Sequence, residues 1–123
     1  MYELKIEQSF AAAHRLREYK GQCEELHGHN WKVEVVVRSE SLNDIGLVID
    51  FQDLKAATRE VLAIFDHTYI NELPDFQKVN PSSENIARYI FDQLALRLEK
   101  GGLRMHKVTA WESEKACASY IRD

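Results

Sequence analysis

The chain has 123 residues, 45% of them hydrophobic and 29% charged, which is typical of one globular domain, here residues 1–123, whose core needs no disulfides. The net charge of −4 disfavours nucleic acid or an anionic membrane as the main partner, and no apolar stretch approaches the roughly 18 residues of a membrane span. Residues 1–5 run straight into a strand pattern without a signal peptide, so we expect a cytoplasmic protein.

The first third of the chain predicts two strands joined by a loop. Residues 2–13 alternate apolar and charged side chains, and residues 30–39 carry four valines between charged neighbours. Both patterns predict strands, the second antiparallel to the first. Residues 15–26 are polar and contain Gly21, so they predict the connecting loop.

Two helices and a closing hairpin are expected after these strands. Asp50 is a typical N-cap for the first helix, and Ser82, or Asn80 followed by Pro81, for the second. The expected elements are, in chain order, a helix from Asp50 to Phe65, an irregular segment at 66–81, a helix from about residues 80–83 to Gly101, and strands at 103–112 and 116–122.

The order strand, strand, helix, helix, strand, strand predicts an α+β fold. We expect a four-stranded antiparallel sheet with the two helices covering one face. Such a sheet has two open edges and one uncovered face. Self-association would cover both, so we expect an obligate oligomer.

Three histidines are candidate metal ligands. Residues i and i+2 of a strand point to the same face, so His27 and His29 point together and Gly28 leaves the opposite face bare. The strand–loop–strand arrangement brings His14 back beside them. Three protein ligands and one open position are typical of catalytic zinc. The alternative is that these imidazoles are ordinary polar residues on one strand face.

Cys23 lies four residues before His27, near whatever would occupy the open position. A metal dication and imidazoles would lower the pKa of its thiol from the usual value of about 8.5 and make it reactive. It could instead be a fourth metal ligand in a structural site, or an incidental loop thiol. Cys117, between two alanines, is expected to be a small buried side chain.

Two acidic residues are further candidates. Asp66 precedes His67, and a carboxylate beside an imidazole fixes its tautomer and raises its basicity; alternatively, Asp66 only solvates the helix C-terminus. Glu112 ends a strand, where it would either grip a guanidine-like edge, such as that of a pterin or guanine, or simply be exposed. Trp31 and Trp111 are expected to pack rather than to stack on a ligand.

Several motifs occur together and span essentially the whole chain. They are Ala11-Ala12-Ala13-His14-Arg15-Leu16, Cys23-x-x-x-His27-Gly28-His29-Asn30, Val48-Ile49-Asp50-Phe51, Phe65-Asp66-His67-Thr68-Tyr69-Ile70-Asn71, Asn80-Pro81-Ser82-Ser83-Glu84-Asn85 and Trp111-Glu112. Jointly these motifs are highly specific. On their basis the chain resembles the 6-pyruvoyl-tetrahydropterin synthase family.

The resemblance implies the tunnelling fold, in which subunits join their sheets into a trimeric barrel and two trimers stack into a hexamer. Active sites in this family lie at subunit interfaces, so His67 would serve the Cys23 of a neighbouring subunit. The residue roles that the resemblance implies are zinc ligation by His14, His27 and His29, general-base catalysis by Cys23, proton relay by Asp66 and His67, pterin binding by Glu112, and substrate binding by Ser82 and Ser83.

Three residues separate Cys23 from His27, as in the bacterial 6-carboxy-5,6,7,8-tetrahydropterin synthases of queuosine biosynthesis. The resemblance therefore implies conversion of 7,8-dihydroneopterin triphosphate into 6-carboxytetrahydropterin, acetaldehyde and triphosphate. Glu24 also matches relatives that use glutamate in place of cysteine and feed folate synthesis, so a dual enzyme that also makes 6-hydroxymethyl-dihydropterin stays open. A 6-pyruvoyl-tetrahydropterin synthase and a pterin-binding structural zinc protein without turnover stay open as well.

Overall fold

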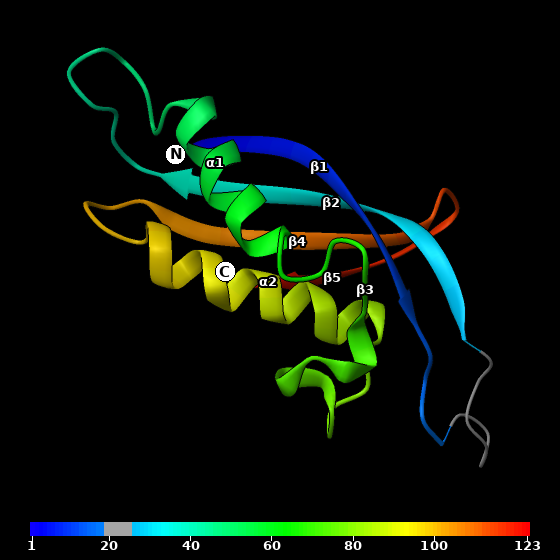
Figure 1. The fold of residues 1–123 in the computed structure, drawn as a ribbon. Helices are drawn as coiled ribbons and strands as arrows, with labels where there is room; N and C mark the ends of the chain where they lie inside the picture. The colour runs from blue at the N-terminus through cyan, green and yellow to red at the C-terminus, as the bar shows by residue number, and fades with distance from the viewer. Residues whose placement is uncertain (19–25) are drawn as a thin grey trace.

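The computed structural model of the protein describes residues 1–18 and 26–123, with His27 described by its backbone alone. Its elements, in chain order, are β1 (Tyr2–His14), β2 (His27–Ser39), α1 (Phe51–Leu62), β3 (Thr68–Tyr69), two single-turn 3-10 helices (Ile70–Glu72 and Pro74–Phe76), α2 (Ser83–Leu98), β4 (Arg104–Ser113) and β5 (Ala116–Ile121) (Figure 1). No helix in this described part is long and apolar enough to cross a membrane.

The strands form one sheet in the order β3-β1-β2-β4-β5. β1 and β2 are antiparallel along their whole lengths, and β4 pairs antiparallel with both β2 and β5. The predicted α+β fold with two helices is confirmed, but the sheet has five strands and is mixed, not four-stranded and antiparallel. The additional strand, β3, pairs in parallel with Ala12 and Ala13. β3 has two residues, too few to show the alternation of apolar and polar side chains by which a strand is predicted.

Both helices lie on the same side of the sheet, with α1 against β1 and α2 against β4 and β5 (Figure 1). Asp50 caps α1 by accepting a hydrogen bond from the backbone N–H of Gln52 at 2.8 Å. Ser82 caps α2 in the same way, accepting from the N–H of Asn85 at 3.1 Å. Both caps confirm predictions, whereas α1 ends at Leu62, earlier than expected.

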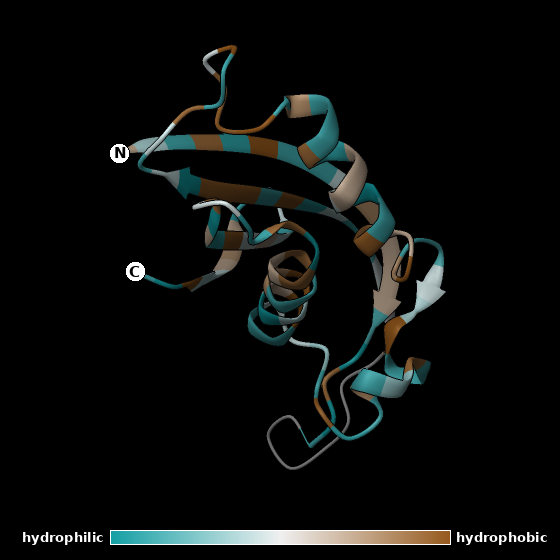
Figure 2. Cartoon of the chain, turned by 90° about the vertical axis from the view of Figure 1, so that its left-hand side faces the viewer, coloured by the Kyte–Doolittle hydropathy of each residue, from teal (hydrophilic) through white to brown (hydrophobic). Residues whose placement is uncertain are grey.

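The hydrophobic core fills the space between the sheet and the helices. Apolar and polar residues alternate along β1 and β2 (Figure 2). Because successive side chains of a strand point to opposite faces, the apolar residues of these strands gather on the core side. The largest fully buried side chains are Trp31, Phe65, Phe76, Phe91, Leu54, Ile70, Ile86, Ile90 and Leu94. This core fixes the strand ends that carry the candidate site.

The uncovered face of the sheet is polar. The Nε atom of Arg38 lies 2.8 Å from Oε1 of Glu3, and Lys32 Nζ lies 4.7 Å from the centre of the Trp111 ring. Trp111 is half-buried there and donates a hydrogen bond from Nε1 to Glu34. Charged and polar side chains therefore interact with one another on this face.

Cys117 is exposed, so the prediction that it is buried is wrong. It lies on β5, the edge strand, where alternate side chains point to opposite faces. Tyr120, on the same strand, points inward instead. Its ring packs edge-on against Phe91 of α2, with 4.9 Å between the ring centroids. Small residues flanking a cysteine give no information about which face of an edge strand it occupies.

The C-terminal end of α2 is joined to β4 and β5. Glu99, which follows the helix, accepts a hydrogen bond from the backbone N–H of Met105 at 2.8 Å and forms an ion pair with Arg122. The Arg122 guanidinium also lies 5.0 Å from the centre of the Phe91 ring. Both chain termini lie at this end of the sheet (Figure 1), opposite the end that carries the candidate site.

Candidate active site

Three side chains that can bind a metal ion meet where β1 ends, β2 begins and β4 ends. Glu112 Oε1 lies 2.7 Å from His14 Nε2 and 3.4 Å from His29 Nε2. One ligand atom from each residue lies within 4.8 Å of the others. The ligands of tetrahedral zinc lie about 3.3 Å apart when the bonds are about 2.0 Å long, so this donor set fits such an ion with small movements.

The register of β1 and β2 brings the two histidines together. His14 is paired with His27 in the backbone register, and Ala12 is paired with His29. Because Ala12 and His14 are two residues apart, His29 lies on the same face of the sheet as His14. The side chain of His27, the third histidine of the predicted set, lies outside the described residues.

Glu112 lies at a β-bulge near the end of β4. The pairing of β4 with β5 runs up to Trp111 and Cys117 and then shifts to Ser113 and Ala116, which leaves Glu112 as the extra residue. A bulge of this kind bends the strand and re-aims a side chain. Instead of a simple exposed strand end, Glu112 is half-buried and in contact with both imidazoles.

Trp31 forms the floor beneath the two imidazoles. It is fully buried, as predicted for a packing residue. Both imidazoles contact the Trp31 ring edge-on. The distance between ring centroids is 5.0 Å for His14 and 5.8 Å for His29, and the angles between the ring planes are 74° and 82°. The Phe10 ring stacks parallel to the Trp31 ring, with 5.8 Å between the ring centroids and 3° between the ring planes. These edge-on contacts restrict the rotation of both histidines.

The carbonyl oxygen of Pro81 selects the tautomer of His14. It lies 2.8 Å from His14 Nδ1, and a carbonyl can only accept, so Nδ1 carries a proton. The neutral ring therefore presents the lone pair of Nε2 toward Glu112. Metal-binding histidines are usually oriented through their second nitrogen in this way. Because Pro81 acts through its backbone, nothing in the side-chain pattern could have revealed this role.

Asp66 and His67 form a second group at the edge of β1. Asp66 Oδ2 lies 3.0 Å from His67 Nδ1, and Asp66 Oδ1 accepts a hydrogen bond from the N–H of Ala11 at 3.0 Å. The bond from Ala11, followed by that from His67, lowers the pKa of Asp66 below its usual value. His67 has a left-handed backbone with φ of 58°, and 82% of its side chain is exposed.

The backbone also fixes this second group, since the His67 N–H donates to the Ala11 carbonyl at 2.6 Å. The side chains of Asp66 and His67 are thus in contact, although adjacent residues at a helix end need not be. The carboxylate orients the imidazole through Nδ1 and leaves Nε2 directed away from it. This is the geometry that the orienter–base interpretation of the pair requires.

A cavity of about 490 Å³ is lined by one residue of each group, His29 of the first and His67 of the second. Its volume is within the usual range for small-molecule sites, about 300 to 1,000 Å³. A Cβ atom added to Gly28 would meet no atom within 4 Å, so the absence of a side chain there leaves open space in the cavity. The residues that line the cavity are Ala11, Ala12, Ala13, Gly28, His29, Asn30, His67 and Thr68.

Two asparagine side chains hold the chain as it leaves β1. Asn71 accepts from the N–H of Arg15 and donates to its carbonyl, both at 2.9 Å. Asn80 does the same for Arg17 at 2.8 and 3.0 Å. Each amide bonds backbone groups as a strand partner would, and so holds the backbone at Arg15 and Arg17. Sequence reasoning did not predict this role for either residue, because polar residues in an irregular segment carry no periodic signal.

The remaining candidate residues are placed as follows. Cys23 and Glu24 lie outside the described residues. Ser82 follows Pro81 and uses its hydroxyl oxygen as the N-cap of α2, and Ser83 is the first residue of that helix. Both serines are half-buried. They lie next to the carbonyl that orients His14, so they border the histidine cluster.

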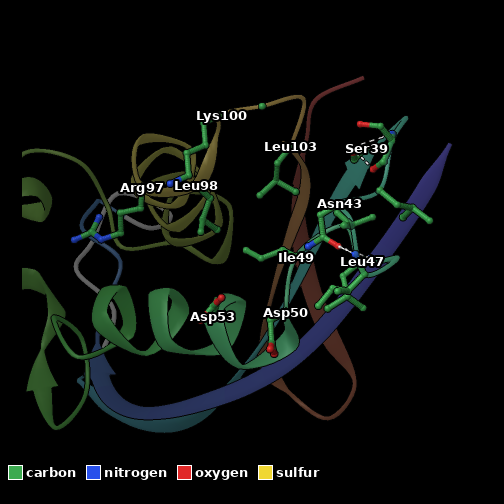
Figure 3. A pocket seen from close by; sticks show the side chains of 15 residues that line it. Ser39, Asn43, Leu47, Ile49, Asp50, Asp53, Arg97, Leu98, Lys100 and Leu103 are labelled. Carbon is green, nitrogen blue, oxygen red and sulfur yellow. Dashed lines mark hydrogen bonds between the residues drawn. The ribbon is translucent and has the colours of Figure 1, made fainter.

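A second cavity, of about 640 Å³, lies at the opposite end of the sheet, between the segment after β2, the start of α1 and the end of α2 (Figure 3). Its lining includes both acidic and basic side chains, Asp50 and Asp53 on one side and Arg97 and Lys100 on the other. The mixture gives it no single charge preference. None of the predicted site residues lines it.

Comparison with known proteins gives a consistent result. Residues 3–123 match the family described as 6-pyruvoyl tetrahydropterin synthase. A relative from Archaeoglobus fulgidus, provisionally named 6-carboxy-5,6,7,8-tetrahydropterin synthase, is 44% identical over 117 residues, which cover 95% of this chain and 93% of the relative. The dihydroneopterin monophosphate aldolase of Pyrococcus furiosus is 36% identical over 107 residues, covering 87% of this chain and 86% of the relative.

The solved structure of 6-pyruvoyl tetrahydropterin synthase from Caenorhabditis elegans matches the fold with a TM-score of 0.85. It is 28% identical, and the match covers 99% of this chain and 96% of that structure. Sequence and fold thus agree over nearly the whole length. The chain belongs to the 6-pyruvoyl tetrahydropterin synthase family.

Proposed function

We propose that the chain is a zinc-dependent 6-carboxy-5,6,7,8-tetrahydropterin synthase, a single cytoplasmic domain acting in queuosine biosynthesis. It would convert 7,8-dihydroneopterin triphosphate into 6-carboxytetrahydropterin, acetaldehyde and triphosphate. The observation that carries this proposal is the cluster of His14, His29 and Glu112 beside a cavity that His29 and His67 both line. The spacing of Cys23 and His27 and the name of the A. fulgidus relative support the 6-carboxy product.

His14, His27 and His29 would hold the zinc ion, since neutral imidazole is a common nitrogen ligand of this metal. Bound zinc would supply Lewis-acid polarisation of the hydroxyl oxygens on the substrate side chain. The hydrogen bond from His14 Nδ1 to the Pro81 carbonyl supports this assignment, because it keeps Nε2 available as the ligand atom.

Glu112 would bind the pterin ring. The amino-pyrimidinone edge of a pterin offers two parallel N–H donors, which match the two oxygens of a carboxylate. Glu112 lies within 3.4 Å of both histidines, so a pterin anchored there would be held beside the proposed metal site. Ser82 and Ser83, which border the cluster, would contribute further substrate contacts.

Cys23, as a thiolate, would remove the proton from the side-chain carbon that bears a polarised hydroxyl. His67, oriented by Asp66, would exchange protons through Nε2 during triphosphate loss and side-chain cleavage. The 82% exposure of the His67 side chain at the sheet edge supports its service to the Cys23 of a neighbouring subunit.

Self-association into trimers, and of two trimers into a hexamer, is part of this proposal. The β1 edge is covered by β3 only at Ala12 and Ala13, and β5 forms the other edge of the sheet. Pairing of these edges between subunits would satisfy their backbone groups. Light scattering tests this directly, and a mass near the 14.3 kDa of one chain would contradict it.

Mass spectrometry of the products tests the reaction. The zinc-loaded protein is incubated with 7,8-dihydroneopterin triphosphate, and we expect 6-carboxytetrahydropterin together with acetaldehyde. Cys23→Ala should retain zinc and lose turnover by about 100-fold or more, the contribution of a general base. Cys117→Ala, which removes the exposed thiol of β5, is the matched control and should be fully active.

Three different results would redirect the proposal. Added 6-hydroxymethyl-dihydropterin would indicate a dual enzyme that uses Glu24, a possibility supported by the P. furiosus aldolase among the relatives. Pyruvoyl-tetrahydropterin as the sole product would indicate the biopterin branch. Unchanged substrate, with zinc lost when Cys23 is replaced, would indicate a pterin-binding protein with a structural zinc site.

A further inference from the structure

We propose that Glu112 is itself a metal ligand in the substrate-free protein and that the pterin draws its carboxylate away from the ion. The pterin part rests on the proposed function, whereas the metal contact rests on geometry. Glu112 would thus have two successive partners: first the ion bound by His14 and His29, and then the N–H edge of the pterin.

The contact between His14 and Glu112 calls for a cation. His14 Nδ1 donates to the Pro81 carbonyl at 2.8 Å, so Nε2 of the neutral ring presents a lone pair. Glu112 Oε1, 2.7 Å away, also presents lone pairs. Two acceptors at this distance repel each other unless a proton or a metal ion lies between them.

A metal ion accounts for the whole cluster, because the same Glu112 oxygen lies 3.4 Å from His29 Nε2. One proton can join one pair of atoms, whereas one dication is shared by all three. Carboxylate oxygen and imidazole nitrogen are both usual zinc ligands, at about 2.0 to 2.2 Å. The carboxylate also brings negative charge to a site whose imidazole ligands are neutral.

The ligands differ in their freedom to move. The side chain of His14 is 2% exposed and is held between Trp31 and the Pro81 carbonyl. Glu112 is 34% exposed and stands on a bulge outside the regular pairing of β4. Of these ligands, therefore, the carboxylate is the one that can leave the ion without disturbing the core.

The two partners of Glu112 exclude each other. A bidentate pair with the pterin edge directs both carboxylate oxygens toward the ring, and so turns the carboxylate away from the metal. Pterin binding would therefore open a coordination position only when the ring of the substrate is in place. Until then, the carboxylate would keep hydroxyls of other molecules from the ion.

Cobalt-substituted protein provides the test, because visible absorption of the ion reports on its ligands. Spectra are recorded for the wild type and Glu112→Gln, with and without 6-methylpterin, which has the ring but no side-chain hydroxyls. We expect 6-methylpterin to change the wild-type spectrum, and Glu112→Gln to show an altered spectrum from the start. In chelator competition, the zinc affinity of Glu112→Gln should be lower than that of the wild type by about tenfold or more.

Two variants serve as controls, and circular-dichroism melts verify that each is folded. Glu114→Gln changes an exposed carboxylate two residues away and should leave the spectrum and zinc affinity unchanged. Glu112→Asp keeps the charge but shortens the side chain, and should weaken zinc as Glu112→Gln does. Wild-type spectrum and zinc affinity in Glu112→Gln would overturn the metal contact; no response of the wild type to 6-methylpterin would overturn the release step.

Turnover of 7,8-dihydroneopterin triphosphate is measured on the same wild-type preparation, so that the two proposals can fail separately. A Glu112-dependent spectrum without turnover would contradict the proposed function and support the metal contact. Turnover with a spectrum that is independent of Glu112 would do the reverse and leave the carboxylate as a pterin anchor alone.

Discussion

Nδ1 of His14 lies 2.8 Å from the carbonyl oxygen of Pro81, a residue 67 positions later in the chain. The contact ties the last residue of β1 to the residue before the N-cap of α2. It has a chemical effect as well as a mechanical one, because it decides which ring nitrogen faces Glu112.

Replacement of Pro81 by alanine should therefore weaken metal binding. The carbonyl remains, but the fixed φ of proline is lost, so the orientation of the His14 ring loosens. We expect zinc affinity to fall about tenfold, the low end of the effect of outer-shell changes. Chelator competition measures this, with Pro74→Ala, at the exposed start of a 3-10 helix, as control. Equal affinities in the two variants would contradict the orienting role.

Gly28→Ala should separate stability from substrate binding. The added methyl meets no atom within 4 Å, and the backbone of Gly28 does not have a positive φ, so stability should stay constant or rise by up to about 1 kcal/mol. The methyl would, however, occupy the cavity beside His29 and His67. We expect KM to rise about tenfold, equivalent to about 1.4 kcal/mol.

The control for this experiment is Gly102→Ala. Gly102 has φ of +91°, which an alanine adopts only with strain, and it lies far from the cavity. That variant should lose about 1 kcal/mol of stability and keep its KM. An unchanged KM in Gly28→Ala would show that substrate does not use the space above Gly28.

Asn71→Ala should lower the stability of the fold by an unusually large amount for the loss of a single polar side chain. It removes both the acceptor for the Arg15 N–H and the donor to the Arg15 carbonyl, and Asn71 is 6% exposed. Leaving such groups without partners costs about 2–3 kcal/mol. Urea unfolding measures this against Gln77→Ala, an exposed position in the same segment, for which little change is expected. A loss below about 0.5 kcal/mol would place the restraint elsewhere.

Asp66 should make stability depend on pH in the acid range. Its pKa is lowered, first by the Ala11 N–H and then by His67, so the folded chain favours the carboxylate more than the unfolded chain does. The resulting stabilisation is present above the usual aspartate pKa of about 3.9 and is lost as the pH falls through the lowered value.

Thermal melts of wild type and Asp66→Asn across this range measure the effect. The wild type should be more stable at neutral pH, and the difference should shrink as the pH falls. Glu3, whose pKa is lowered by its hydrogen bond to Arg38, contributes in both proteins and cancels. A difference that is constant with pH would mean that the charge of Asp66 has no part in its hold on β1.

Sequence reasoning succeeded where side chains follow a period or a capping rule. Asp50 and Ser82 were expected as caps and are caps, and the alternation along β1 and β2 predicted the two longest strands. Trp31 was expected to pack and is fully buried. These features depend on neighbours in the chain, so the local sequence contains them.

Features that depend on distant backbone groups were missed. β3 exists because the chain after α1 passes the edge of β1, and Asn71 acts on Arg15, 56 residues earlier. The bulge at Glu112 arises from a shift between β4 and β5. None of these leaves a local pattern, and the exposure of Cys117 likewise depends on which face of an edge strand it occupies.

The helix α2 connects the two ends of the molecule. Just before its first turn, the Pro81 carbonyl holds the His14 imidazole, and just after its last turn, Glu99 holds the start of β4 and the end of β5. A shift of this helix along its axis would therefore move a ring nitrogen at the site. We therefore expect metal affinity to depend on the packing of α2: a larger side chain at fully buried Ala87 should weaken zinc binding as well as lower stability.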